Sequence, residues 1–197
     1  MDWDNIPEFK SRLKEYRKHR NLARKELKKI QKLKEKYYFL DRIVQLRKDT
    51  DTRDDDIELE IAVQHLFESI HFNCSKPTIN GDVDFRAKFK EFYFGIEVKG
   101  GNLVGETETL QPFKHKIIHD DTFHPLLIYN NTKNNDSWDE VRKKISVGVK
   151  FGLLMTPELR KGYLKLINGK ISWELFVNSL NSTGEIKFSN KALKGTK

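Results

Sequence analysis

Two acids and a lysine fall close together in the stretch GDVDFRAKFKEFYFGIEVKG, residues 81–100. Apolar and polar residues alternate through this stretch, which predicts two strands of a hairpin. Asp84, Glu97 and Lys99 all fall in the polar phase. A turn at 90–91 sets Asp84 directly across from Glu97, with Cβ atoms ~4.5–5.5 Å apart on one face. Lys99 then lies two residues along the same face, ~6.6 Å from Glu97 by strand rise.

Two carboxylates facing each other repel, so a shared proton, a basic partner or a cation must compensate. Oxygen ligands at this separation suit Mg²⁺ or Mn²⁺. An ammonium beside them would steady developing negative charge, and the set therefore favours phosphodiester hydrolysis. The alternative is a solvent-exposed charged face on which Asp84 or Glu97 pairs with Lys99 or Arg86.

These residues resemble the PD-(D/E)XK nuclease superfamily, whose core is a helix bearing an acid, a strand with Asp, and a strand with (D/E)-x-K. GDVDFRA and IEVKG are similar to the two strand motifs. The preceding helix, IELEIAVQHLFESIHF, places Glu60 ahead of its apolar stripe, as in Mrr-like restriction endonucleases and Holliday-junction-resolvase-like nucleases. His71 stands where those families often have glycine. The match covers residues 57–100 well and extends loosely through HPLLIYNN and FGLLMTPELRKGYLKLINGKISWELF.

The resemblance implies a restriction-endonuclease-like α/β fold, with a central mixed sheet flanked by helices. It implies a Mg²⁺-dependent endonuclease of DNA, with Mn²⁺ as the other candidate cofactor. The implied metal ligands are Asp84, Glu97 and the carbonyl of Val98. Lys99 would orient the attacking water, and Glu60 would bind the metal through water or hold Lys99.

Two further residues have a possible role at this site. Gln111 lies where some members of the superfamily place a functional glutamine. Asp82 shares a face with Asp84 and is its rival, although the same register would pair it beyond Lys99.

The elements that position these residues are read from periodicity and from turn signals. We expect a long helix from about Ile6 to Arg47 or two helices with a break near Tyr37, a polar link, and a helix over 57–72. A connection, the hairpin and a buried strand follow, with helices around them. The expected elements beyond the hairpin are a weak helix at 107–119, a strand at 124–129, a helix at 138–149, a helix entered at Thr156-Pro157 and closed at Asn168-Gly169, and a short helix opened by Ser172. The expected domains are an arm at 1–50, a nuclease-like domain at 51–185 and a polar tail at 186–197.

The net charge of +8 is concentrated in the predicted arm. Residues 10–36 contain thirteen Lys or Arg and three Glu, a local balance of +10, so the rest of the chain sums to about −2. A basic arm on a near-neutral body is typical of a protein that binds a polyanion. The side chains expected to contact nucleic acid are Arg17, Lys18, Arg20, Arg24, Lys25, Lys28 and Lys29.

The same segment carries an apolar stripe at 4–3 spacing that is interrupted at Arg20, Lys34 and Asp41. The helix is therefore expected to pack partly on the core and partly on a second copy. A homodimer also suits an enzyme that cuts both DNA strands, because two cuts need two sites.

Composition excludes several other classes of protein. No run approaches the ~18 apolar residues of a membrane span, and the N-terminus lacks a signal peptide's apolar core. Cys74 is the single cysteine, which indicates a reducing cytoplasm. His115 and His119 lack a third zinc ligand. Two alternative functions stay open: a non-catalytic nucleic-acid-binding protein that keeps the fold, and a nuclease that acts on RNA.

Overall fold

The computed structural model describes residues 7–44, 53–77, 83–100, 123–130 and 151–188, with the side chains of 53–56 left aside. The chain divides into two compact units, Met1–Tyr38 and Phe39–Lys197. The first unit holds the long helix, and the second holds the sheet and the remaining helices.

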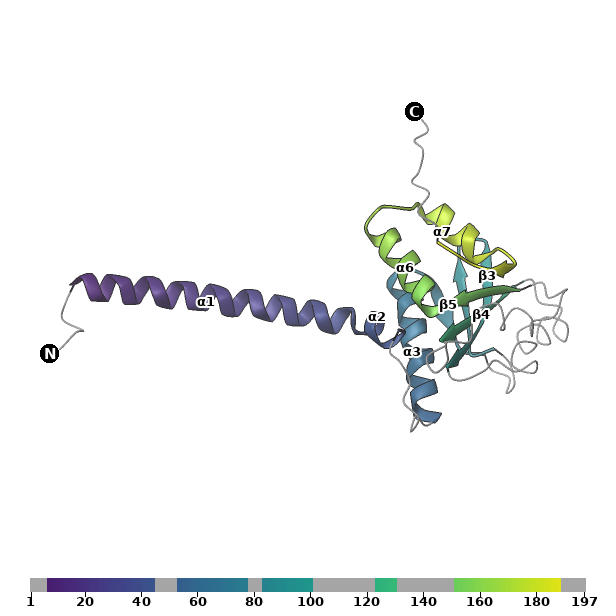
Figure 1. Cartoon of the computed structure of the whole chain (residues 1–197), viewed down its shortest axis with the longest axis horizontal. Helices are drawn as coiled ribbons and strands as arrows, with labels where there is room; N and C mark the ends of the chain where they lie inside the picture. Colours follow the sequence, from purple (N-terminus) through teal and green to yellow (C-terminus); the bar gives the residue numbers. More distant parts are fainter. Residues whose placement is uncertain (1–6, 45–52, 78–82, 101–122, 131–150, 189–197) are drawn as a thin grey trace, which may run out of the picture. The chain divides into compact units, whose positions relative to one another are not determined.

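The first unit contains α1, a continuous 30-residue helix over Pro7–Lys36 (Figure 1). No residue of α1 is buried. The helix ends at a turn at Tyr37, so the predicted break is confirmed at that residue.

Past the break, α2 (Tyr38–Arg42) contributes Phe39 and Leu40 to the core of the second unit, followed by Ile43. These residues lie within the stretch 1–50 that was expected to be an arm.

The second unit is built on one six-stranded sheet in the order β1-β2-β3-β4-β5-β6. The first three strands pair antiparallel, and β3 to β6 pair parallel. The strands are β1 (Asn73–Ser75), β2 (Phe85–Phe89), β3 (Phe92–Gly100), β4 (His124–Asn130), β5 (Gly152–Met155) and β6 (Gly184–Glu185). The mixed sheet and the strand at 124–129 are thus confirmed.

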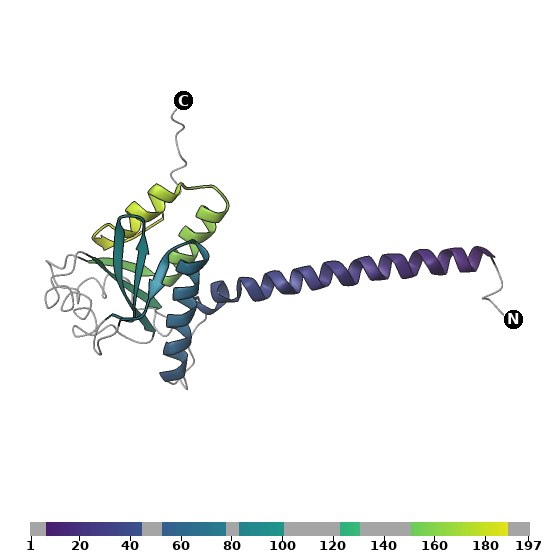
Figure 2. The ribbon, with the colours of Figure 1, turned by 180° about the vertical axis from the view of Figure 1, so that it is seen from behind.

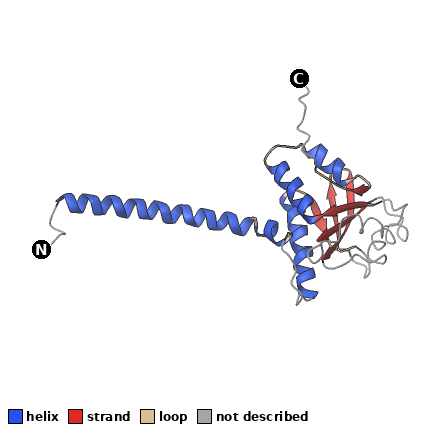
Figure 3. Ribbon diagram, viewed as in Figure 1, coloured by secondary structure: helices blue, strands red, loops and turns tan. Residues whose placement is uncertain are grey.

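Helices α3 (Arg53–Ser69) and α6 (Thr156–Ile167) lie on one side of the sheet (Figures 1 and 2). Colouring by secondary structure shows the same arrangement, with helices gathered against the red strands (Figure 3). Aromatic rings fill the contact: Phe67 of α3 meets Phe85 of β2 with ring centroids 6.0 Å apart. This layer anchors the hairpin that carries the predicted chemistry.

The conformation at the end of α3 explains why the families that this sequence resembles often have glycine at the position of His71. His71 has φ 63°, the left-handed conformation that glycine adopts at least cost. The His71 N–H donates to Glu68 O (3.0 Å) and the Phe72 N–H donates to Phe67 O (3.1 Å), the pattern of a Schellman cap. The Phe67 and Phe72 rings pack edge to face at 5.1 Å and complete it. A histidine therefore occupies a glycine-favouring position here.

Helix α6 begins differently from the expectation. Met155 is the N-cap, no side chain caps the helix, and Thr156 is already its first residue. Its predicted end is confirmed, because Asn168 is the C-cap and Gly169 follows with φ 65°.

Helix α7 (Trp173–Leu180) begins as predicted. The Ser172 hydroxyl accepts a hydrogen bond from the Leu175 N–H at 3.1 Å, which is the geometry of an N-cap.

Two features of the second unit differ from the sequence-based picture. The connection after α3 contains β1, a short strand paired with β2. Ile186 and Phe188, in the stretch expected to be a polar tail, are buried. The helices expected at 107–119 and 138–149 lie outside the described residues. Among the residues described, no helix is both long and apolar enough to cross a membrane.

Candidate active site

The hairpin pairs in the predicted register. Phe89 lies opposite Phe92, and Phe85 opposite Ile96 is the last pair of the ladder. Continuing this register by one residue would set Asp84 opposite Glu97. Lys90 takes φ 52° in the turn, a conformation that a side chain permits at some cost. Asp84 itself lies just before β2, and its Oδ2 accepts a hydrogen bond from the Val98 N–H at 2.7 Å. The carboxylate is thereby fixed against the backbone of β3.

Glu97 is completely buried, although it belongs to the polar phase of its strand. Its Oε1 lies 2.7 Å from Lys99 Nζ, in a close ion pair rather than a well-aligned hydrogen bond. Its Oε2 has no hydrogen-bond partner within the described parts of the chain. Buried polar atoms are normally satisfied, so this oxygen is positioned for a ligand from outside the described residues.

The pKa values of Glu97 and Lys99 are both raised above their ordinary values. Burial, with the neighbouring charge of Asp84, raises the pKa of Glu97 to about 7 against the opposing effect of Lys99. Burial alone would lower the pKa of Lys99, but the charges of Glu97, Asp84 and Glu60 outweigh it and raise that pKa. Glu97 therefore exchanges its proton near neutral pH, while Lys99 stays charged.

Glu60 lies on α3 and belongs to the same electrostatic cluster. Its charge acts on both Glu97 and Lys99, and its side chain is half-buried. In the described chain, no three His, Cys, Asp or Glu side chains converge closely enough to bind one metal ion. A metal held here would take fewer than three such side chains from the described residues, and backbone and water oxygens could complete its shell.

Asp84 and Glu97 fit a divalent cation on two observations. One is the buried Oε2, for which the described residues supply no hydrogen-bond partner. The other is the mutual repulsion of the two carboxylates, which a cation between them would remove. The donors are all oxygen, as Mg²⁺ and Mn²⁺ prefer.

The surroundings of Glu97 explain its burial. In the parallel register Leu127 of β4 is the partner of Glu97, and Tyr129 is the partner of Lys99. Both belong to a buried apolar cluster with Leu153 of β5 and with Phe151, which immediately precedes β5. Leu153 pairs with Leu127 and so lies on the same face. The carboxylate thus sits at the margin of a hydrophobic surface, where its charged form is disfavoured.

The structure also reveals a close contact that sequence reasoning missed. A Cβ at Gly95 would lie 2.3 Å from the Phe123 ring, so only glycine fits beneath it. The Arg86 guanidinium lies over the same ring at 5.7 Å. A glycine inside an alternating strand, two residues before Glu97, was the available signal, because it indicates close approach.

The remaining site candidates fall elsewhere. The seven basic residues proposed to contact nucleic acid all lie on α1, and all are exposed. Lys29 pairs with Glu26 at 2.7 Å, an exposed contact of little energetic weight. Gln111 and Asp82 lie outside the described residues.

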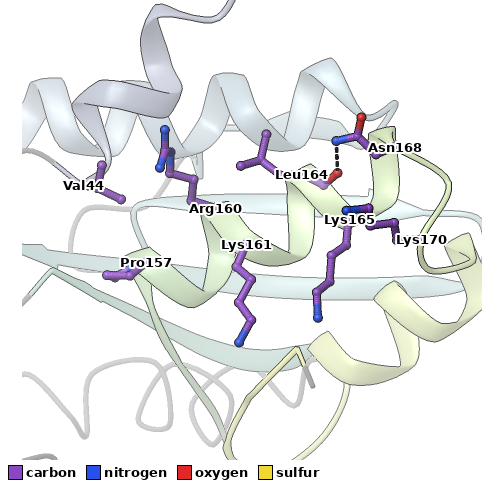
Figure 4. Close-up of a pocket in the computed structure, with 8 residues that line it drawn as sticks. All are labelled: Val44, Pro157, Arg160, Lys161, Leu164, Lys165, Asn168 and Lys170. Carbon is purple, nitrogen blue, oxygen red and sulfur yellow. Dashed lines mark hydrogen bonds between the residues drawn. The ribbon is translucent and has the colours of Figure 1, made fainter. Parts of the chain in front are cut away.

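A cavity of about 530 Å³ lies along α6 (Figure 4). It is lined by Val44, Pro157, Arg160, Lys161, Leu164, Lys165, Asn168 and Lys170. Three of its four cationic side chains are already engaged. Lys161 Nζ lies 3.0 Å from a Glu158 oxygen, Lys165 Nζ donates to Phe188 O at 2.8 Å, and Arg160 lies 3.8 Å from an Asp41 oxygen. Its lining contains none of the acids of the hairpin.

The six-stranded mixed sheet with its helical layer is the restriction-endonuclease-like fold, the fold of PD-(D/E)XK nucleases. The structure of the restriction endonuclease FokI matches with a TM-score of 0.51 and 17% sequence identity, over 77% of this chain and 31% of that one. FokI bound to DNA matches with a TM-score of 0.46 and 15% identity, over 77% and 30%. The chain thus spans less than a third of the FokI chain. No protein-family model matches the sequence, and no curated protein matches it.

Proposed function

We propose that the protein is a metal-dependent endonuclease that hydrolyses phosphodiester bonds in DNA. The observation that carries this proposal is Glu97, a fully buried carboxylate held between the acid of Asp84 and the ammonium of Lys99. A structural ion pair does not require a second acid that raises the pKa of the first. A site that binds a divalent cation does need two acids close together, and each then raises the pKa of the other.

Asp84, Glu97 and the carbonyl of Val98 would hold Mg²⁺ or Mn²⁺. When bound, such an ion neutralises charge on the scissile phosphate and lowers the pKa of water. The Val98 N–H holds Asp84 in place, so the same backbone segment that offers the carbonyl also orients the carboxylate.

Lys99 supplies the positive charge of the site. Its Nζ contacts Glu97, and its side chain is 30% exposed, so it can reach both the carboxylate and an incoming phosphate. Its raised pKa keeps it protonated at neutral pH, which suits electrostatic stabilisation and orientation of the attacking water through its N–H groups. Glu60 would hold Lys99, or bind the metal through water.

The basic arm and the shared fold support DNA as the substrate. Contacts from lysine and arginine to phosphates give affinity without sequence information, so binding should be strongly salt-dependent. Two strands would be cut by a homodimer, in which each copy brings one site.

A plasmid assay tests the proposal. Supercoiled DNA is incubated with the protein in Mg²⁺, Mn²⁺ or EDTA, beside Asp84→Asn and Lys99→Ala. Lys88→Ala is the matched control, because Lys88 is an exposed lysine of the same hairpin. We expect metal-dependent nicking that each site variant lowers at least about 100-fold and the control leaves unchanged.

Other outcomes have definite meanings. Binding without nicking in any metal would favour a nucleic-acid-binding protein with the nuclease fold. Cleavage of RNA but not of DNA would reassign the substrate. Activity that survives both site substitutions would place the catalytic centre elsewhere.

A further inference from the structure

Helix α1 and the following Tyr37 carry a regular heptad spacing, with charged residues at two of its positions. Positions 9, 13, 16, 20, 23, 27, 30, 34 and 37 alternate in steps of four and three, as the a and d positions of a coiled coil do. All are apolar or aromatic except Arg20 and Lys34. Seven of these nine positions therefore form a stripe that, at ~100° per residue, spans about 120° of the helix.

This stripe is uncovered in the first unit. Within α1 no residue is buried, and Leu27, Tyr16 and Ile30 are 63%, 60% and 49% exposed. A 30-residue helix gains little from propensity alone, since helices in proteins are stabilised mainly by packing an apolar face. We therefore expect another apolar surface to pack against this stripe.

The basic residues lie on the other side of the helix. Ten of the thirteen Lys and Arg residues of 10–36 fall within an arc of about 140°, centred roughly opposite the stripe. They are Lys10, Lys14, Arg17, Lys18, Arg24, Lys25, Lys28, Lys29, Lys32 and Lys36. A polyanion would be drawn to this face and would leave the apolar stripe exposed.

We propose that the occupant of the stripe is α1 of a second copy, packed antiparallel. Full overlap of Pro7–Lys36 with its own copy aligns a positions with d positions along the whole helix. The facing pairs are Leu13 with Ile30, Arg20 with Ala23, Leu27 with Tyr16, and Lys34 with Phe9.

The two charged seam residues decide the orientation. In a parallel pair, Arg20 would face Arg20 and Lys34 would face Lys34 of the second copy, like charges brought together in the seam. In the antiparallel pair, Arg20 faces the small side chain of Ala23, which leaves room for its stem to reach solvent. Lys34 faces the ring of Phe9, to which a cation is attracted.

This pairing changes the assignment of one residue. Arg20 belongs to the seam, whereas the other six residues expected to contact nucleic acid lie on the outward basic arc. The seam gives the homodimer of the proposed function a surface. It does not depend on nuclease activity, so hydrodynamic and cross-linking measurements test it separately.

The first experiment measures the mass of the full chain by sedimentation, with bound nucleic acid removed. Two exposed leucines of α1 provide matched variants: Leu27→Lys on the stripe, and Leu22→Lys about 140° away. We expect a dimer whose dissociation constant rises at least about 100-fold in Leu27→Lys, because two leucines leave the seam, and is unchanged in Leu22→Lys. Both side chains are at least half exposed on α1, so both variants should fold.

The salt dependence of binding distinguishes a second copy of α1 from a polyanion as the partner of this helix. Screening weakens repulsion between two arms of +10, so self-association should strengthen with salt, whereas binding to a polyanion should weaken. A monomer at all salt concentrations, or equal effects of the two leucine variants, would overturn the proposal.

The second experiment tests the orientation by disulfide cross-linking in a Cys74→Ala background, which removes the only native cysteine. Chains with Leu13→Cys and chains with Ile30→Cys carry tags of different size and are mixed before oxidation. We expect cross-links between the two chain types and few within either. Predominant linkage of Leu13→Cys chains to each other would mean a parallel pair and would overturn the antiparallel seam.

Discussion

The buried carboxylate of Glu97 should make stability fall as pH rises. Its pKa is about 7 in the folded protein and 4.5 for the ordinary group, so folding favours the protonated form. The stability from this group is fully present below pH 4.5 and is lost as pH rises through about 7. Lys99 also has a raised pKa, but its contribution is constant until pH exceeds its ordinary value of 10.5.

The size of the effect follows from the difference in pKa. A difference of about 2.5 units corresponds to about 3 kcal/mol in total, of which about 2.5 kcal/mol falls between about pH 5 and about pH 8. Glu97→Gln removes the titration and keeps the shape of the side chain. The difference in unfolding free energy between wild type and Glu97→Gln should therefore change by about that amount across the range.

The assay is urea unfolding in EDTA at several pH values, followed by circular dichroism. Comparison with Glu97→Gln cancels the titration of the groups that do not interact with Glu97. Asp84→Asn should shrink the slope, because the charge of Asp84 is the second cause of the raised pKa. Saturating Mg²⁺ should flatten the wild-type slope, since a cation binds the ionised form. Parallel pH profiles for wild type and Glu97→Gln would refute the reasoning.

Two further substitutions test the frame around the site. His71→Gly should stabilise the protein by about 0.5–1 kcal/mol in the same unfolding assay, because glycine adopts the left-handed conformation at the end of α3 at less cost. A loss of stability would mean that the contact between the His71 and Trp173 rings, whose centroids are 6.2 Å apart, contributes more than this relief. Gly95→Ala should cost about 1–3 kcal/mol, because its Cβ would overlap the Phe123 ring, and an unchanged midpoint would show that this ring moves freely.

The hairpin could be predicted from the sequence because apolar and polar residues alternate along both of its strands. A one-residue shift would have exposed Phe85 and Phe94, so the register follows from the alternation alone. The cap at Ser172 was predicted from local signals in the same way. The break near Tyr37 was one of two arrangements that the sequence left open, and the structure shows that one.

Other features depend on contacts distant in sequence and could not be read in this way. β1 has three residues that are exposed or half-buried, so it lacks any apolar alternation. Glu97 lies in the polar phase, and only its cross-strand neighbour Leu127 and the cluster around it account for its burial. Ile186 and Phe188 sit in a polar stretch but are buried, and the Phe188 ring stacks on Phe176 at 5.1 Å.

The central claim is that Asp84 and Glu97 together hold one divalent cation beside Lys99. Anomalous diffraction from a crystal soaked in Mn²⁺ tests it most directly. We expect one peak about 2–2.5 Å from an oxygen of each carboxylate, and no peak in Asp84→Asn. A Mn²⁺ peak elsewhere, or a cation bound by only one of the two carboxylates, would contradict the account.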